Sequence, residues 1–171
     1  MNNAFWQTSL WQQLGAAIDT LDQAIAACPD DLWQAPLWPD DPPGYAEFWY
    51  LAYHVLFWLD FYLSGAVEGF TPPPPFTLTE LDPTGFPERV YEKVELQSYL
   101  THCRRKCQST IETLTDARAQ QRCAFSWGEA SFGELLLYNM RHVQEHAAQF
   151  NLFLGQQRGV GAAWVVKARR P

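Results

Sequence analysis

The feature that most constrains the fold of this chain is a stretch that is apolar on every side. Residues 45–64 are dominated by large apolar and aromatic side chains, and Gly65 follows them as a typical helix stop. The strongly apolar run from Phe48 to Leu63 is shorter than the roughly 20 residues that span a bilayer, and it contains His54 and Asp60, so we predict a buried helix and no membrane partner. A helix that is hydrophobic all round has to be covered on all sides.

Other helices are predicted to provide this cover. Apolar residues recur at helical spacing in three more segments, 5–28, 88–115 and 131–154. The last of these begins with a capping box formed by Ser131 and Glu134, and we expect it to stop at Gly155. Residues 116–130 are expected to be a connection. The predicted fold is therefore all-α, a four-helix bundle in which residues 65–87 make a long crossover between helices 2 and 3.

The crossover and the tail have less regular sequences. Residues 65–87 include Thr-Pro-Pro-Pro-Pro-Phe, which favours an extended polyproline conformation; a surface linker is the simpler interpretation and a ligand for an SH3- or WW-type domain the alternative. We expect residues 1–155 to form the bundle domain and residues 156–171 a tail, in which 162–166 is a short strand or an extended segment docked on the bundle. The apolar helix is covered either by the bundle or by another subunit, and we predict a homodimer.

Charge and cysteine content limit the classes of function. The 171 residues include 12 basic and 19 acidic side chains, which gives a net charge of −7. This acidic balance argues against binding to a phosphate backbone, so no nucleic-acid partner is expected. The sequence does not begin with a basic region followed by an apolar one, and four cysteines without a secretion signal predict reduced thiols and a cytoplasmic location.

Three of the four histidines are candidate metal ligands. His142 and His146 are four residues apart, which places both imidazoles on one helix face together with large apolar residues, and His54 lies in the middle of the apolar helix. Burying three imidazoles without partners is unfavourable, and a divalent cation would offset this. Three ligands leave a coordination position open, as in catalytic sites, and imidazole suits Zn, Ni, Cu or Fe. Core histidines satisfied by hydrogen bonds are the alternative, and His102 does not obviously join the group.

Two further motifs favour simpler interpretations. His142 to His146 also matches the His-x-x-Glu-His pattern of inverted zinc proteases, but residues 147–171 contain no Asp, Glu or His to complete such a site, so this protease type is not expected. Cys103 and Cys107 are also four residues apart. A second metal or redox site is one interpretation of this pair, and small buried apolar side chains are the simpler one.

Polar residues near the histidines are candidates for supporting roles. Tyr50 and Tyr138 lie four residues before His54 and His142, and so share their helix faces. Each tyrosine is a candidate to orient a ligand or to donate a proton, as is Asn139. Ordinary aromatic packing is the alternative role for the two tyrosines.

The arrangement of these residues resembles the DinB-like, or YfiT-like, superfamily of metal-dependent enzymes over about residues 5–155. One histidine lies in the middle of helix 2, a long crossover follows, and His-x-x-x-His lies on helix 4. The resemblance implies a four-helix bundle in which His54, His142 and His146 bind a divalent metal, most often nickel or zinc. Some relatives carry a carboxylate in place of the first helix-4 histidine, so this chain is more similar to the all-histidine members.

The resemblance also implies a type of reaction. Characterised relatives are thiol-dependent transferases or isomerases that use low-molecular-weight thiols such as bacillithiol or mycothiol, so a small-molecule substrate is expected. We predict a transferase or hydrolase in which the metal activates a thiol or a water for attack on an electrophile. Two other interpretations stay open: a non-catalytic bundle that binds a metal or small ligand, and an interaction protein that uses the proline-rich segment.

Overall fold

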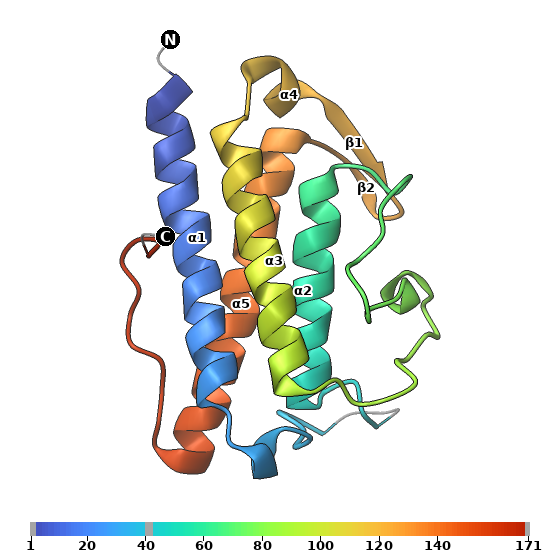
Figure 1. Cartoon of the computed structure of the whole chain (residues 1–171), viewed down its shortest axis with the longest axis vertical. Coiled ribbons are helices and arrows are strands. Elements are labelled where there is room, and N and C mark those ends of the chain that lie inside the picture. The colour runs from blue at the N-terminus through green and yellow to red at the C-terminus, as the bar shows by residue number, and fades with distance from the viewer. Residues whose placement is uncertain (1–2, 40–42, 170–171) are drawn as a thin grey trace.

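Four long helices dominate the computed structural model, which describes residues 3–39 and 43–169 (Figure 1). The bundle helices are α1 (Asn3–Ala27), α2 (Phe48–Ser64), α3 (Lys93–Glu112) and α5 (Phe132–Arg158). Both α1 and α2 pack against α3 and against α5, so α1 and α2 occupy opposite corners of the bundle. The predicted four-helix bundle with a long crossover between its second and third helices is confirmed. Among the described residues, no helix combines the length and the apolarity that crossing a bilayer requires.

Local sequence signals set the start of α5 and the ends of α2 and α5. The capping box of Ser131 and Glu134 is present at the start of α5. At the end of α2, Gly65 adopts the left-handed conformation with φ of +72°, which residues with a Cβ rarely adopt. The predicted stop of the last helix at Gly155 is wrong, because α5 continues for another turn and the left-handed residue that ends it is Gly159, with φ of +67°.

Residues 116–130 contain regular structure that the sequence analysis missed. They hold the short helix α4 (Asp116–Gln120), the strand β1 (Arg122–Phe125) and most of the strand β2 (Gly128–Ser131). The two strands pair antiparallel through a two-residue turn, with Phe125 opposite Gly128. This hairpin carries Trp127 at its tip. Strands of four residues give too short a periodic pattern to be recognised with certainty in a sequence.

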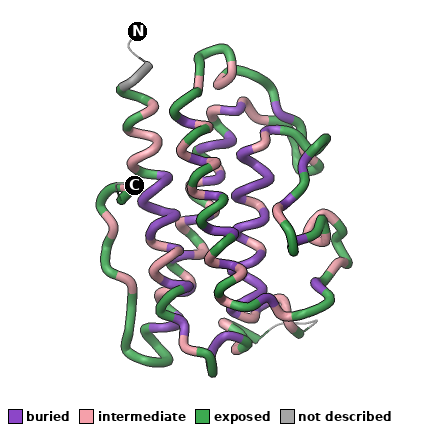
Figure 2. The backbone as a smooth tube through the Cα atoms, in the orientation of Figure 1, coloured by how far each residue is buried: buried purple, intermediate pink, exposed green. Residues whose placement is uncertain are grey.

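The crossover covers the outer face of α2 (Figures 1 and 2). Phe76 stacks on Tyr53 of α2 and Tyr99 of α3, with ring centroids 6.0 and 4.4 Å away. The proline run is not extended throughout, because the chain turns at Pro74 and Pro75, where the Phe76 N–H donates to the Pro73 carbonyl. The cover of α2 therefore comes largely from the chain itself. The homodimer stays a prediction, and the apolarity of α2 no longer argues for it.

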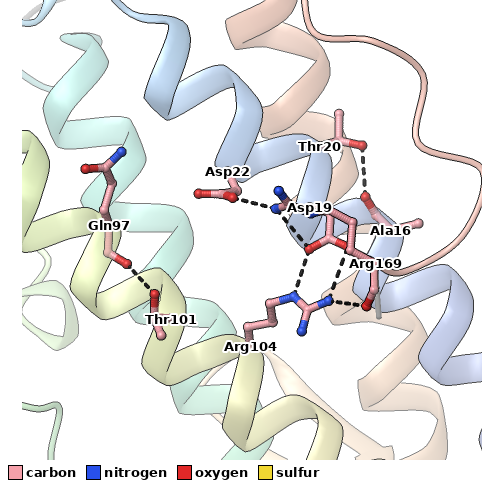
Figure 3. Close-up of polar contacts among 8 residues, drawn as sticks. All are labelled: Ala16, Asp19, Thr20, Asp22, Gln97, Thr101, Arg104 and Arg169. Atoms are coloured by element: carbon pink, nitrogen blue, oxygen red, sulfur yellow. Dashed lines mark hydrogen bonds and ion pairs between the residues drawn. The ribbon is translucent and has the colours of Figure 1, made fainter. Parts of the chain in front are cut away.

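The C-terminal tail runs back along α1 in an extended conformation (Figure 1). The Ala168 N–H donates to the Gln12 carbonyl at 2.9 Å. Beyond it, Arg169 and Arg104 of α3 converge on the carboxylate of Asp19 in α1 (Figure 3). Within the described part of the tail, no residue belongs to a strand, so the extended form is the one observed.

Candidate metal centre

The three histidines singled out in the sequence come together between α2 and α5. The ring centroid of His54 lies 5.4 Å from that of His142 and 5.3 Å from that of His146, and the latter two are 4.7 Å apart. One nitrogen from each ring lies within 4.8 Å of the other two, a spacing at which the three rings can hold one metal ion. In the ranges that the structure describes, no other group of three His, Cys, Asp or Glu side chains has this geometry.

The side of α2 that carries His54 is less completely covered by the rest of the chain than its other sides. Every residue of α2 is buried except His54, Trp58 and Ser64. The side chain of His54 is 29 % exposed. The imidazoles are therefore set into the core, but that of His54 is partly exposed to solvent, as a catalytic metal site requires and a closed structural site does not.

Burial keeps two of the imidazoles uncharged. It lowers the pKa of His142 to about 3, and the neighbouring imidazoles of His146 and His54 act in the same direction. Burial and His54 likewise lower the pKa of His146 to about 4, against opposing effects of Gln149 and Glu80. Both rings are thus neutral at physiological pH, which is the protonation state that binds metal ions.

Glu80 is the residue of the site that the sequence analysis missed. It lies in a short 3-10 turn of the crossover (Thr79–Leu81), and its side chain is only 4 % exposed. Its Oε2 atom is 2.6 Å from His54 Nδ1 and 2.8 Å from Trp58 Nε1. Burial raises the pKa of Glu80, but hydrogen bonds from His54, Tyr50 and Trp58 outweigh this effect and hold the pKa below its ordinary value.

This contact fixes the tautomer of His54. An ionised carboxylate only accepts hydrogen bonds, so the Nδ1 atom of His54 carries the hydrogen and donates it to Glu80. With Nδ1 engaged by Glu80, Nε2 is the ring nitrogen of His54 that is left to contact an ion. A carboxylate that orients a metal-binding histidine in this way is a common second layer of metal sites.

Unpaired polar atoms test whether a metal fits here. The Nδ1 atoms of His142 and His146 are buried and have no hydrogen-bond partner among the described residues, and the same holds for Oε1 of Gln149, whose side chain raises the pKa of His146. Leaving a buried polar group unsatisfied costs about 1–3 kcal/mol, so such atoms are rare in folded proteins. A cation bound through these Nδ1 atoms would offset this cost, and a donor set of three imidazoles fits a divalent metal ion.

The three supporting residues proposed from the sequence lie in different surroundings. Tyr50 donates a hydrogen bond to Glu80, and its ring stacks on Phe86 with centroids 4.9 Å apart. Tyr138 stacks on Trp127 of the hairpin at 5.2 Å. Asn139 is buried and its Nδ2 atom donates to the carbonyl of Leu59 at 3.0 Å, while its Oδ1 atom has no partner within the described chain. The structure therefore joins Tyr50 to the hydrogen bonds around His54 and gives Tyr138 mainly aromatic contacts.

The fourth histidine belongs to a different cluster. Asp60, buried in α2, lies 2.6 Å from Lys106 Nζ and 3.4 Å from His102 Nε2, and it accepts a hydrogen bond from Tyr99. These partners explain how the apolar helix accommodates a carboxylate.

Cys103 and Cys107 are fully buried on α3. Burial raises the pKa of both thiols, that of Cys107 to about 12, so neither is a reactive thiolate.

The family profile of the DinB superfamily matches residues 13–150. The chain belongs to this superfamily, as the layout of its histidines predicted. The matched range includes α2, the crossover and all three clustered histidines. Comparison with the curated proteins gives no match.

Proposed function

We propose that the protein is a divalent-metal-dependent enzyme of the DinB type, acting as a thiol-dependent transferase or as a hydrolase. His54, His142 and His146 are the proposed ligands. The observation that carries the proposal is the presence of buried imidazole nitrogens without partners at an opening in the cover of α2. Histidines with a purely structural role are expected to have hydrogen-bond partners when they are buried.

The donor set defines what a bound ion would contribute. When bound, a divalent cation supplies Lewis acidity that lowers the pKa of a water or thiol in contact with it. Three imidazoles suit zinc or nickel first, and iron and copper are compatible. A small-molecule substrate, with a low-molecular-weight thiol as co-substrate, fits the access at His54, and we place the activity in the cytoplasm.

Side chains around the histidines hold the proposed metal ligands in position. Glu80 holds His54 in the tautomer that presents Nε2 to the ion. Burial raises the pKa of Tyr50, and the charge of Glu80 raises it further, so its hydroxyl stays protonated and keeps its hydrogen bond to that carboxylate. Tyr50 therefore helps to position Glu80. Tyr138 remains a candidate for contact with substrate, whereas the fully buried Asn139 can act only through the residues around it.

A non-catalytic role is favoured by one observation on α5. Tyr138 packs against Trp127 and Tyr62, and Asn139 is committed to the Leu59 carbonyl. If these two residues serve packing alone, the bundle binds a metal or a small ligand without catalysing a reaction. Replacing Tyr138 by Phe would then leave every measured property of the metal-loaded protein unchanged.

A screen for thiol transfer and hydrolysis tests the proposed activity. Zinc- and nickel-loaded protein is mixed with bacillithiol or mycothiol and an electrophile such as 1-chloro-2,4-dinitrobenzene, and with activated esters for hydrolysis. We expect acceleration that the His54→Ala, His146→Ala double variant loses and that the His102→Ala control retains. Metal-loaded protein that accelerates none of these reactions would favour the non-catalytic role.

A further inference from the structure

A cleft of about 340 Å³ lies between the crossover and the tip of the hairpin. Trp58 and Phe61 of α2 form part of its lining, and residues of the crossover and the hairpin form the rest. The full lining is Trp58, Phe61, Val67, Glu80, Leu81, Pro83, Phe125, Ser126 and Trp127. No residue of this set is a proposed metal ligand, but Glu80 contacts one directly.

The cleft lies close to the metal centre along the same face of α2. Trp58 and Phe61 follow His54 by four and seven residues, which places them one and two helical turns farther along the helix. One turn is about 5.4 Å. The ring centroids of His54 and Trp58 are 6.2 Å apart. A molecule seated over Trp58 therefore has to extend by about one turn to reach the histidines.

Aromatic rings build the wall of the cleft on the hairpin side. Trp127 is 46 % exposed, although it stacks on Phe125 and on Tyr138 with interplanar angles of 13° and 20°. Phe125 in turn packs edge-to-face on Phe61 at 5.4 Å. The hairpin thus holds a large indole in a fixed orientation while leaving much of its surface uncovered, so the indole offers apolar surface against which a flat apolar group can pack.

The charge of the residues that line the cleft limits which aromatic groups can bind there. Glu80 is the only acidic residue among those that line the cleft. Ser126 is the other polar residue, and no cationic side chain lines the cleft. An anionic group would therefore be repelled without compensation, whereas an uncharged ring system meets apolar walls.

We propose that this cleft binds an uncharged aromatic portion of the substrate and directs the reactive end toward the histidine cluster. The proposal deepens the proposed function and rests on it. Trp127 and Trp58 supply the apolar contact surface, and Glu80 links the cleft to His54. Trp127 acts as a specificity-determining residue and does not take part in the chemistry.

A pair of fluorescent probes with the same ring skeleton tests the cleft independently of any metal. N-phenyl-1-naphthylamine is uncharged, and 8-anilino-1-naphthalenesulfonate adds one sulfonate. We expect the uncharged probe to bind metal-free protein more tightly than the sulfonate, and Trp127→Ala to weaken its binding by about fivefold or more.

Trp164→Ala and Trp6→Ala are the matched controls, since both indoles are exposed and line other grooves, and neither substitution should change the affinity. The cleft is not the binding site if Trp127→Ala leaves the affinity unchanged. A larger loss in either control variant, or tighter binding of the sulfonate, overturns the proposal as well.

A second experiment tests the link to the metal centre. The ring protons of bound N-phenyl-1-naphthylamine should relax faster in Co²⁺-loaded protein than in Zn²⁺-loaded protein, because a paramagnetic ion lies about one helical turn away. The His54→Ala, His146→Ala variant should keep the affinity for the probe and lose the difference. Equal relaxation in both native samples contradicts the link. Protein that binds the probe but neither metal would overturn the proposed function while leaving the cleft established as a ligand site.

Discussion

Two groups of buried polar side chains in the same bundle differ in how well their atoms are satisfied. Asp19, with 0 % exposure, accepts hydrogen bonds from Arg104 at 2.8 Å and from the Arg169 backbone N–H at 2.6 Å (Figure 3). The cluster between α2 and α5 instead leaves Nδ1 atoms of His142 and His146 without partners in the described chain.

The difference separates a structural from a functional arrangement. Asp19 joins α1 to α3 and to the tail through its hydrogen bonds with Arg104 and Arg169, which we call the Asp19 network. Both oxygens of its carboxylate have partners within the protein. The histidines are held in place by their helices and by Glu80, yet the Nδ1 atoms of His142 and His146 remain available to a bound metal ion. Buried imidazoles without partners are expected to lower the free energy of unfolding of the metal-free protein, whereas the Asp19 network should raise it.

The largest effect is expected from breaking the Asp19 network. Arg104→Ala leaves a fully buried carboxylate with one cationic partner in place of two, which should lower the free energy of unfolding by about 3 kcal/mol. Urea unfolding measures this loss, and metal content should not change. The neighbouring exposed Arg105→Ala is the control, with an expected change within about 0.5 kcal/mol. Equal effects of the two substitutions would contradict a special role for the network.

The pH dependence of stability separates the two groups in metal-free protein. The unfolded chain takes up protons on its histidines near pH 6.5, but His142 and His146 in the folded chain do so only near 3 and 4. The unfolded state therefore binds more protons in this window, and stability falls as the pH is lowered through it. Between pH 6.5 and 5.5 the loss is about 1 kcal/mol for each imidazole, or about 2 kcal/mol together.

The contribution of Asp19 is lost in a different window. Its pKa is held below the ordinary value of 3.8, because hydrogen bonds from Arg104 and Arg169 outweigh the opposing effect of burial. Its stabilising effect is thus present above pH 3.8 and disappears only at lower pH. Unfolding titrations of native protein and of a His142→Leu, His146→Leu variant measure both windows. A variant with the native slope between pH 6.5 and 5.5 would show that these imidazoles are not buried as neutral groups.

A smaller effect tests the link between the crossover and the metal centre. Glu80→Gln removes the charge that orients His54 but keeps a side chain of the same shape, and it should weaken metal binding about tenfold, or about 1.4 kcal/mol. Competition with a chromophoric chelator measures the affinity. Glu145→Gln removes an exposed carboxylate next to His146 in sequence and should have little effect. A native affinity in Glu80→Gln would assign Glu80 to packing only.

The sequence was sufficient for the bundle and for the histidines because both follow helical periodicity. The four-residue spacing of His142 and His146 and the position of His54 on an apolar helix determine their faces once the helices are known. The same logic does not extend to Glu80. It lies in a segment without periodicity, between prolines, so no pattern in the sequence indicates that its carboxylate reaches His54.

The remaining errors have related physical causes. The apolar surface of α2 indicated that a cover was needed without indicating whether another subunit or the crossover would provide it. Gly155 and Gly159 are equally good helix stops by composition, and only the packed structure shows which one adopts the left-handed conformation. The hairpin is too short to produce a clear alternation, although it positions Trp127.

The metal content of tag-free protein tests the central claim most directly. Elemental analysis of the native chain should find about one divalent ion per chain, and the His54→Ala, His146→Ala variant should contain none, while His102→Ala, at a histidine outside the cluster, keeps the native content. Native protein that holds no metal, even after reconstitution with zinc and nickel, would show that the three histidines are core residues and would contradict the proposed metal centre.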